Sequence, residues 1–169
     1  MTILREGDIE IAIPSWASGR RFDDNAVHGL SHCHLKAVDF IIEAPGKTMF
    51  VEVKNPPAEG PGADSTPWTE RPDERRDLVR KYRDSFLYEW AAGRSGSVVG
   101  YYVLVATPGL EGRLLADLSR SLRVLLPVGL PTKPVWTREI ARQATAFSID
   151  SWNRYLADFP VTRVGQAAD

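Results

Sequence analysis

The stretch KAVDFIIEAPGKTMFVEVKNP, residues 36–56, decides the fold because it holds two apolar runs joined by a short turn. Both runs are rich in β-branched and aromatic residues, which favours strands. Pro45 presets φ at the second position of a β-turn, and Gly46 accepts the positive φ of the third position of a type II turn. We therefore predict a β-hairpin that turns at these two residues.

Three charged side chains interrupt the apolar runs of this hairpin. Pairing that is symmetric about the turn places Asp39 opposite Glu52, and side-chain alternation places Lys54 on the same face as Glu52. Opposed carboxylates destabilise a sheet unless a positive charge compensates them or one is protonated. Lys54 is one such charge, and a divalent ion would be a stronger one; hard oxygen ligands suit Mg²⁺ or Mn²⁺. The alternative is a structural salt bridge on a half-exposed sheet.

The rest of the chain predicts helices and further strands around the hairpin. We expect a long loop over residues 55–72 because it contains several prolines and glycines. Element order predicts an α/β (α+β) fold, in which helices flank a mixed central sheet, and a single domain over residues 1–169. Beyond the hairpin we expect strands in residues 8–14, 97–106 and 144–150, and helices in residues 72–92, 109–126 and 151–159.

The predicted helix over residues 72–92 begins with proline and two acids, which favour a helix N-terminus, and is followed by Gly93. Apolar side chains that recur at helical spacing predict its buried face. They are Val79, Tyr82, Phe86 and Trp90.

An acid on one strand, Glu-x-Lys on the next and then a helix resembles the pattern of the PD-(D/E)xK nuclease superfamily, which has the restriction-endonuclease-like fold. Here VDF contains Asp39, and VEVKN contains Glu52 and Lys54. Val38 stands where the pattern has proline, a position at which the superfamily often varies. The resemblance covers residues 36–56 and extends loosely to residue 106 through the order of elements.

This resemblance implies metal-assisted hydrolysis of phosphodiester bonds in DNA, with RNA as the second choice. It implies that Asp39, Glu52 and the carbonyl of Val53 bind Mg²⁺ or Mn²⁺, and that Lys54 positions the attacking water or helps to deprotonate it. Many members carry one more acid on an early helix. The residues here offer three candidates and no choice among them: Glu10, Asp23 and Asp24.

Basic residues on the helix over 72–92 form one stripe beside its apolar face. They are Arg76, Arg80 and Arg83, with Lys81 nearby. Phosphate contacts would use such a stripe, so we expect nucleic acid to bind there. The alternative is a solvated helix face whose charge is balanced by neighbouring acids.

The segment HGLSHCH gathers all three histidines, His28, His32 and His34, and the single cysteine, Cys33. Their spacing matches no standard zinc pattern. Local packing is the first interpretation, a histidine near the predicted acids is the second, and zinc is the third.

Composition bounds the remaining expectations. The net charge of −1 predicts that a nucleic-acid surface is local, and one cysteine excludes an intrachain disulfide. With no apolar run long enough for a membrane span and no signal-peptide pattern, we expect a cytoplasmic protein without a membrane partner.

A nuclease of this size would take its choice of target from a homodimer or a larger nuclease complex. The competing hypothesis is a catalytically inactive domain of the same fold that binds nucleic acid or assembles with partners.

Overall fold

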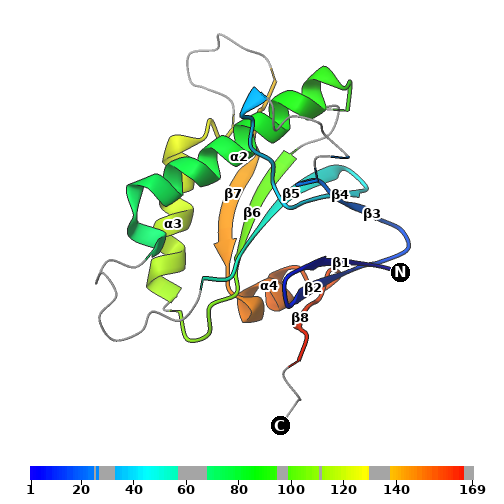
Figure 1. Cartoon of the computed structure of the whole chain (residues 1–169), viewed down its shortest axis with the longest axis vertical. Helices are drawn as coiled ribbons and strands as arrows, with labels where there is room; N and C mark the ends of the chain where they lie inside the picture. The colour runs from blue at the N-terminus through cyan, green and yellow to red at the C-terminus, as the bar shows by residue number, and fades with distance from the viewer. Residues whose placement is uncertain are drawn as a thin grey trace.

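The computed structural model describes residues 1–24, 26, 33–56, 68–94, 99–110, 112–129 and 138–165. Its strands form two sheets, a three-stranded sheet in the order β1-β2-β8 and a five-stranded sheet in the order β3-β4-β5-β6-β7 (Figure 1). The small sheet consists of β1 (Thr2–Glu6), β2 (Ile9–Ile13) and β8 (Val161–Arg163). The large sheet consists of β3 (Ser18–Arg21), β4 (Phe40–Ala44), β5 (Lys47–Lys54), β6 (Val99–Val105) and β7 (Gln143–Phe147).

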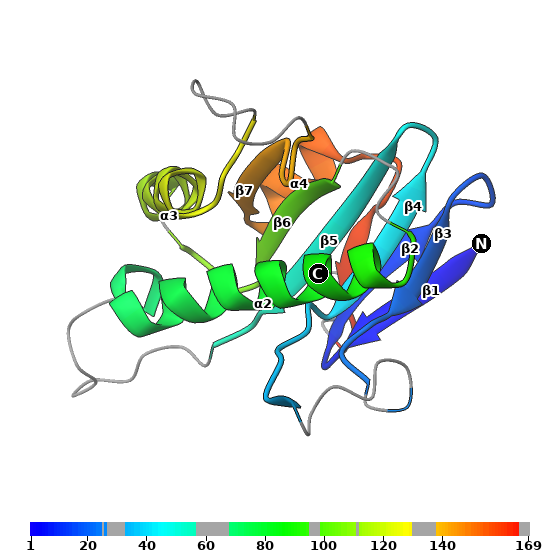
Figure 2. The ribbon, with the colours of Figure 1, turned by 90° about the horizontal axis from the view of Figure 1, so that it is seen from above.

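The described helices lie on both sides of the five-stranded sheet. They are α2 (Pro72–Ala91), α3 (Gly112–Leu125) and α4 (Ile149–Tyr155), and a 3-10 turn, η2 (Trp68–Glu70), precedes α2. Seen from two directions, α2 and α3 cover one face of the large sheet, and the small sheet lies with α4 on the other side (Figure 2). The α+β fold with a mixed central sheet is confirmed.

The predicted hairpin is confirmed with its register. β4 and β5 run antiparallel, with Ile41 opposite Phe50 and Ala44 opposite Lys47. Gly46 has a φ of 75°, as the third position of a type II turn requires. β5 then pairs with β6, and β6 with β7, in parallel, so the carboxyl ends of these three strands lie at one edge of the sheet.

Both faces of the large sheet are buried, which explains why β6 is a continuous apolar run instead of an alternating one. One core lies under α2 and α3 and includes Phe50, Tyr82 and Tyr101. The other lies under the small sheet and α4 and includes Leu104 and Trp152. A charged side chain in the middle of this sheet, such as that of Glu52 in β5, is therefore withdrawn from water.

The expectation that Trp90 lies on the buried face of α2 is wrong, since Trp90 is 59% exposed. The buried face is centred on Leu78, Tyr82, Ser85 and Glu89. With about 100° of rotation per residue, Trp90 lies nearly a third of a turn away from the centre of that face. Ser85 and Glu89 are polar, which hid the true centre of the face in the sequence.

Within the part of the chain that the structure describes, none of the helices combines the length and apolar character that crossing a membrane requires.

Candidate active site

Asp39 and Glu52 lie next to each other at the carboxyl end of β5, on the face that α2 covers. Asp39 immediately precedes β4 and is 6% exposed, whereas Glu52 lies within β5 and is 1% exposed. The strand ladder ends at the pair Phe40–Val51, one residue short of the predicted Asp39–Glu52 pair. Asp39 uses its Oδ2 to accept a hydrogen bond of 2.6 Å from the Val53 N–H. This bond extends the strand pairing by a side chain.

Contacts from α2 hold the chain that leads into Asp39. The Lys36 N–H donates to Asp84 Oδ2 at 2.8 Å, and the Val38 N–H donates to Ser85 Oγ at 3.0 Å. On the other side, the Asp39 carbonyl accepts from the Phe22 N–H at 2.8 Å. The backbone of Asp39 is thus fixed by α2 and by the residue that follows β3, and its carboxylate has a defined position.

Lys81 of α2 reaches between the two acids. Its Nζ lies 2.7 Å from Glu52 Oε1 and 2.9 Å from Glu52 Oε2, and 3.5 Å from Asp39 Oδ1. It also lies 3.9 Å from Asp23 Oδ2. One ammonium group therefore faces three carboxylates, and this is the compensating cation that the opposed acids require.

Lys54 is the second cation of the group. Its Nζ lies 3.3 Å from Glu52 Oε1, on the face that alternation predicts. Asn55, the next residue, points the other way, and its Nδ2 donates to Asp8 Oδ1 at 2.8 Å on the side of the small sheet. We refer to Asp23, Asp39, Glu52, Lys54 and Lys81 as the acid–lysine cluster.

Burial dominates the electrostatics of the acid–lysine cluster. Burial and the nearby Asp39 raise the pKa of Glu52 to about 8, although Lys81 and Lys54 oppose the rise. Burial also raises the pKa of Asp39, against the effects of Lys81 and the Val53 N–H. For Lys81, burial disfavours the charged form, but Glu52 and Asp39 outweigh it and raise the pKa above its ordinary value. The lysines do not fully compensate the acids.

The donors of the cluster fit a hard divalent cation in chemistry, but Lys81 takes the position between them. Asp39 and Glu52 offer carboxylate oxygens. The Val53 N–H points to Asp39, and the carbonyl of a strand residue points to the same side as its N–H, so this carbonyl faces the acids too. Over the described residues there is no group of three or more His, Cys, Asp or Glu side chains arranged to hold a metal. An ion bound by both acids would require Lys81 to move.

The early acid candidates separate clearly. Asp23 is the one that approaches the cluster, through Lys81. Glu10 lies in β2 and pairs with Arg5, and Asp24 accepts a hydrogen bond from the Ala26 N–H at 2.8 Å. Position in the fold therefore favours Asp23 as the third acid.

The predicted basic stripe is only partly open to solvent. Arg76 pairs with Asp73, Arg80 donates to the His34 carbonyl, and Arg83 donates to the Leu125 carbonyl at 2.9 Å. Lys81 lies apart from the stripe, because its ammonium turns inward to the cluster. The side chains of Arg76 and Arg80 are 73% and 50% exposed, and Arg83 is exposed as well, whereas that of Lys81 is only 14% exposed.

The histidine segment adds no described ligand to the cluster. His34 and Cys33 are exposed, and His34 has a φ of 55°. His28 and His32 lie outside the described residues, so their predicted roles stay predictions.

Sequence reasoning missed the inward role of Lys81 and the support from Asp84 and Ser85. The sequence does contain a signal for the inward position of Lys81. A spacing of four residues places Lys81, Ser85 and Glu89 on one helix face. This face also carries the buried Tyr82. Polar residues inside a buried helix face indicate partners across the interface.

Glu89 of α2 is the buried centre of a second group of charged side chains. Glu89 accepts from Arg20 Nη2 at 2.7 Å, and from Arg94 Nη2 at 2.8 Å and Arg94 Nε at 3.0 Å. Burial opposes the ionisation of Glu89, but the hydrogen bonds from Arg94 and the charge of Arg20 outweigh it and lower the pKa below its ordinary value. We refer to these three residues as the Glu89 group.

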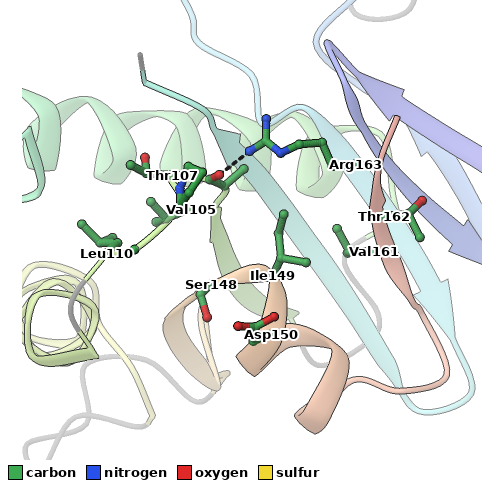
Figure 3. A pocket seen from close by; sticks show the side chains of 12 residues that line it. Val105, Thr107, Leu110, Ser148, Ile149, Asp150, Val161, Thr162 and Arg163 are labelled. Atoms are coloured by element: carbon green, nitrogen blue, oxygen red, sulfur yellow. Dashed lines mark hydrogen bonds between the residues drawn. The ribbon is translucent and has the colours of Figure 1, made fainter. Parts of the chain in front are cut away.

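A pocket of about 640 Å³ lies at the same edge of the sheet, between the loop after β6, the start of α4 and β8 (Figure 3). Arg163 lies in its wall and donates to the Ala106 carbonyl, and it also contacts Asp8 and Asn55. Its contacts lie on the side of Asn55, away from Lys54 and the acids. The pocket therefore contributes no side chain to the acid–lysine cluster.

Comparisons with protein-family models, with curated proteins and with solved structures found no match.

Proposed function

We propose that this chain is a metal-dependent nuclease of the PD-(D/E)xK type that hydrolyses phosphodiester bonds in DNA, with RNA as the second choice. The observation that carries the proposal is the convergence of Asp39 and Glu52 from adjacent strands, with Lys54 beside Glu52. The order of elements supports it as well, because the strand with Glu-x-Lys follows the acid and is itself followed by a helix and a parallel strand.

The cost of the arrangement supports a functional role. Two neighbouring carboxylates are buried against an apolar sheet, and the raised pKa of each shows that burial outweighs the attraction of the lysines. A buried ion pair that served only stability could be replaced by apolar residues with no loss. A strongly perturbed acid such as Glu52, at the edge of parallel strands, is typical of functional sites.

Each member of the cluster has a definable role in such a reaction. Asp39, Glu52 and the Val53 carbonyl would hold Mg²⁺ or Mn²⁺, which when bound lowers the pKa of a coordinated water and neutralises charge on the phosphate. The Val53 N–H binds Oδ2 of Asp39, so Oδ1, the oxygen that faces Lys81, keeps one orientation. Lys54, 3.3 Å from Glu52 Oε1, is placed to orient the attacking water and to stabilise negative charge as it develops.

The substrate would contact the protein outside the cluster. Arg76 and Arg80 on α2 are at least half exposed and would contact backbone phosphates. Such contacts position nucleic acid without reading its sequence. We propose that sequence choice comes from a homodimer or a larger nuclease complex.

A catalytically inactive nucleic-acid-binding or assembly module is the second candidate. One observation favours it: Lys81 contacts both acids and supplies a compensating charge without any metal. In such a module Asp39, Glu52 and Lys81 would be a structural network that ties α2 to the sheet.

Cleavage assays separate the two candidates. Double-stranded DNA, single-stranded DNA and RNA are incubated with the protein in Mg²⁺, Mn²⁺ or chelator, beside Asp39→Asn and Lys54→Ala. Glu43→Gln is the matched control, because Glu43 lies in β4 and pairs with Arg20 away from the cluster. Metal-dependent cleavage that survives only in the wild type and the control supports the nuclease. Nucleic-acid binding without cleavage under any metal supports the module.

A further inference from the structure

The position of Lys81 has a consequence for metal binding. Its Nζ is in contact with both oxygens of Glu52 and is 3.5 Å from Asp39 Oδ1. Mg²⁺ binds oxygen at about 2.1 Å, so an ion held by the same oxygens would come within contact distance of this ammonium group. Two cations at that separation repel strongly where water is scarce. Lys81 and a divalent ion therefore exclude each other.

Asp23 offers the Lys81 ammonium group a second carboxylate within reach. Asp23 Oδ2 lies 3.9 Å from its Nζ, and the Asp23 side chain is 49% exposed, whereas the Glu52 side chain is 1% exposed. A lysine ammonium sits on four flexible carbons and can turn from the buried acid to the half-exposed one. This movement takes the charge toward solvent, where its desolvation cost is lower.

The helix that carries Lys81 need not move with it. α2 is joined to the chain before Asp39 through Asp84 and Ser85, and to β3 through Glu89 and Arg20. These contacts lie between about one and a little over two turns on the carboxyl side of Lys81. The exchange is then a rotation of one side chain while the carboxylates stay in place.

Resting on the proposed function, we propose that Lys81 is an exchangeable counter-ion: it holds Asp39 and Glu52 together in the metal-free protein and turns to Asp23 when a divalent ion binds. The cluster has two exclusive states, one held by lysine and one held by metal. The work of displacing Lys81 weakens metal binding, and the presence of Asp23 limits that loss.

Metal binding measured directly tests this exchange. Mn²⁺ is titrated into the wild type, Lys81→Met, Lys81→Arg and Asp23→Asn at pH 7.5, with calorimetry and the electron paramagnetic resonance of free Mn²⁺ as readouts. Removing the competing charge should tighten binding in Lys81→Met by about tenfold or more. Lys81→Arg keeps the charge and should bind no more tightly than the wild type. Asp23→Asn should bind several-fold more weakly, since the displaced lysine loses its partner.

Lysine labelling of the unmodified wild type supplies a second readout that does not depend on how the variants fold. Brief acetylation followed by mass spectrometry should show Lys81 becoming several-fold more reactive when Mg²⁺ is added. Lys47, at the turn end of the hairpin, serves as the internal control and should not change.

The outcomes separate this inference from the proposed function. Tighter binding in Lys81→Met together with metal-dependent labelling supports the exchange. Metal binding in the wild type with equal or weaker binding in Lys81→Met, and constant labelling, overturns the exchange and leaves the nuclease proposal standing. Metal binding in neither protein overturns both.

Discussion

Glu52 and Glu89 are both buried between α2 and the five-stranded sheet, at 1% and 3% exposure, yet their pKa values shift in opposite directions. Glu89 has two arginine partners: Arg94 binds it through two nitrogens, and Arg20, which also pairs with Glu43, binds it through one. Glu52 shares Lys81 with Asp39 and Asp23. Both side chains are carboxylates, but burial and the nearby Asp39 outweigh the two lysines beside Glu52, whereas the hydrogen bonds from the two arginines outweigh the burial of Glu89.

Under the proposed function, the comparison separates a structural acid, Glu89, from a metal-binding acid, Glu52. Arginine offers a planar fork that matches a carboxylate and stays charged, which suits a permanent link. Lysine is a compact charge on a flexible stem, which suits an exchangeable contact. The Glu89 group joins β3 to the carboxyl end of α2. The acid–lysine cluster keeps two carboxylates close together in a buried place, which costs free energy. A bound divalent metal ion would offset that cost.

The largest expected difference between the two glutamates is in catalysis. Glu52→Gln should lower Mg²⁺-dependent DNA cleavage by about a thousandfold, because the amide loses the charge that holds the ion. Glu89→Gln should keep its rate per folded molecule within about threefold of the wild type. Initial rates on a fluorescent duplex, normalised to the folded fraction from circular dichroism, make the measurement. Equal losses in the two variants would contradict the division of roles.

The free energy of unfolding should rank the two variants in the opposite order, with the larger loss in Glu89→Gln. Glu89→Gln should lower the free energy of unfolding by about 2–3 kcal/mol, because Arg20 and Arg94 lose a charged partner, although both are partly solvated. Glu52→Gln should change it by less than about 1 kcal/mol, since burial already disfavours the charged carboxylate. Urea unfolding at pH 7.5 without metal gives both values. A larger loss in Glu52→Gln would mean that this cluster serves stability first.

The pH dependence of stability should also have opposite signs. Because the pKa of Glu52 is raised to about 8, its contribution is fully present below the ordinary value near 4.5 and is lost as pH rises toward 8. The wild type should lose on the order of 1–2 kcal/mol relative to Glu52→Gln between pH 6 and pH 8.

The pKa of Glu89 is lowered, so its contribution is present above pH 4.5 and is lost as pH falls through the shifted value. The stability gap between the wild type and Glu89→Gln should therefore shrink in acid. Urea titrations at several pH values measure both trends, and a gap that widens in acid would contradict the assignment for Glu89.

The smallest expected effect concerns the outer face of α2, above both glutamates. Arg76→Ala should weaken DNA binding by about threefold and reduce the slope of log affinity against log salt by about 1. Arg142→Ala is the control, because Arg142 lies before β7, at the opposite end of the parallel strands. Fluorescence anisotropy across a salt series measures both. Equal effects of the two variants would show that the α2 stripe has no special role.

The hairpin could be predicted from the sequence because its determinants are local. Pro45 and Gly46 specify the turn, and the turn sets the register that brings Glu52 and Lys54 to the side of Asp39. The long helix was predictable for the same reason, from its first-turn proline and acids and the glycine that follows it.

Local sequence patterns could not predict which distant segments supply partners to the two acids. Lys81 and Asp23 meet the acids only after α2 packs on the sheet and the chain after β3 turns toward it. β3 has the sequence SGRR, without an apolar alternation, and forms because β4 offers it an edge. Trp90 misled the prediction because apolar spacing alone cannot reveal a helix face that is partly polar.

Arg163 joins three parts of the chain that are made at very different times. It contacts Asp8 from the turn after β1, Asn55 next to Lys54, and the carbonyl of Ala106 at the end of β6. A ribosome-bound chain that lacks β8 therefore has the acids and their lysines but lacks the contacts that Arg163 makes beside them. The end of β5 that carries Lys54 is therefore complete only after β8 has been made, because 108 residues separate Asn55 from Arg163.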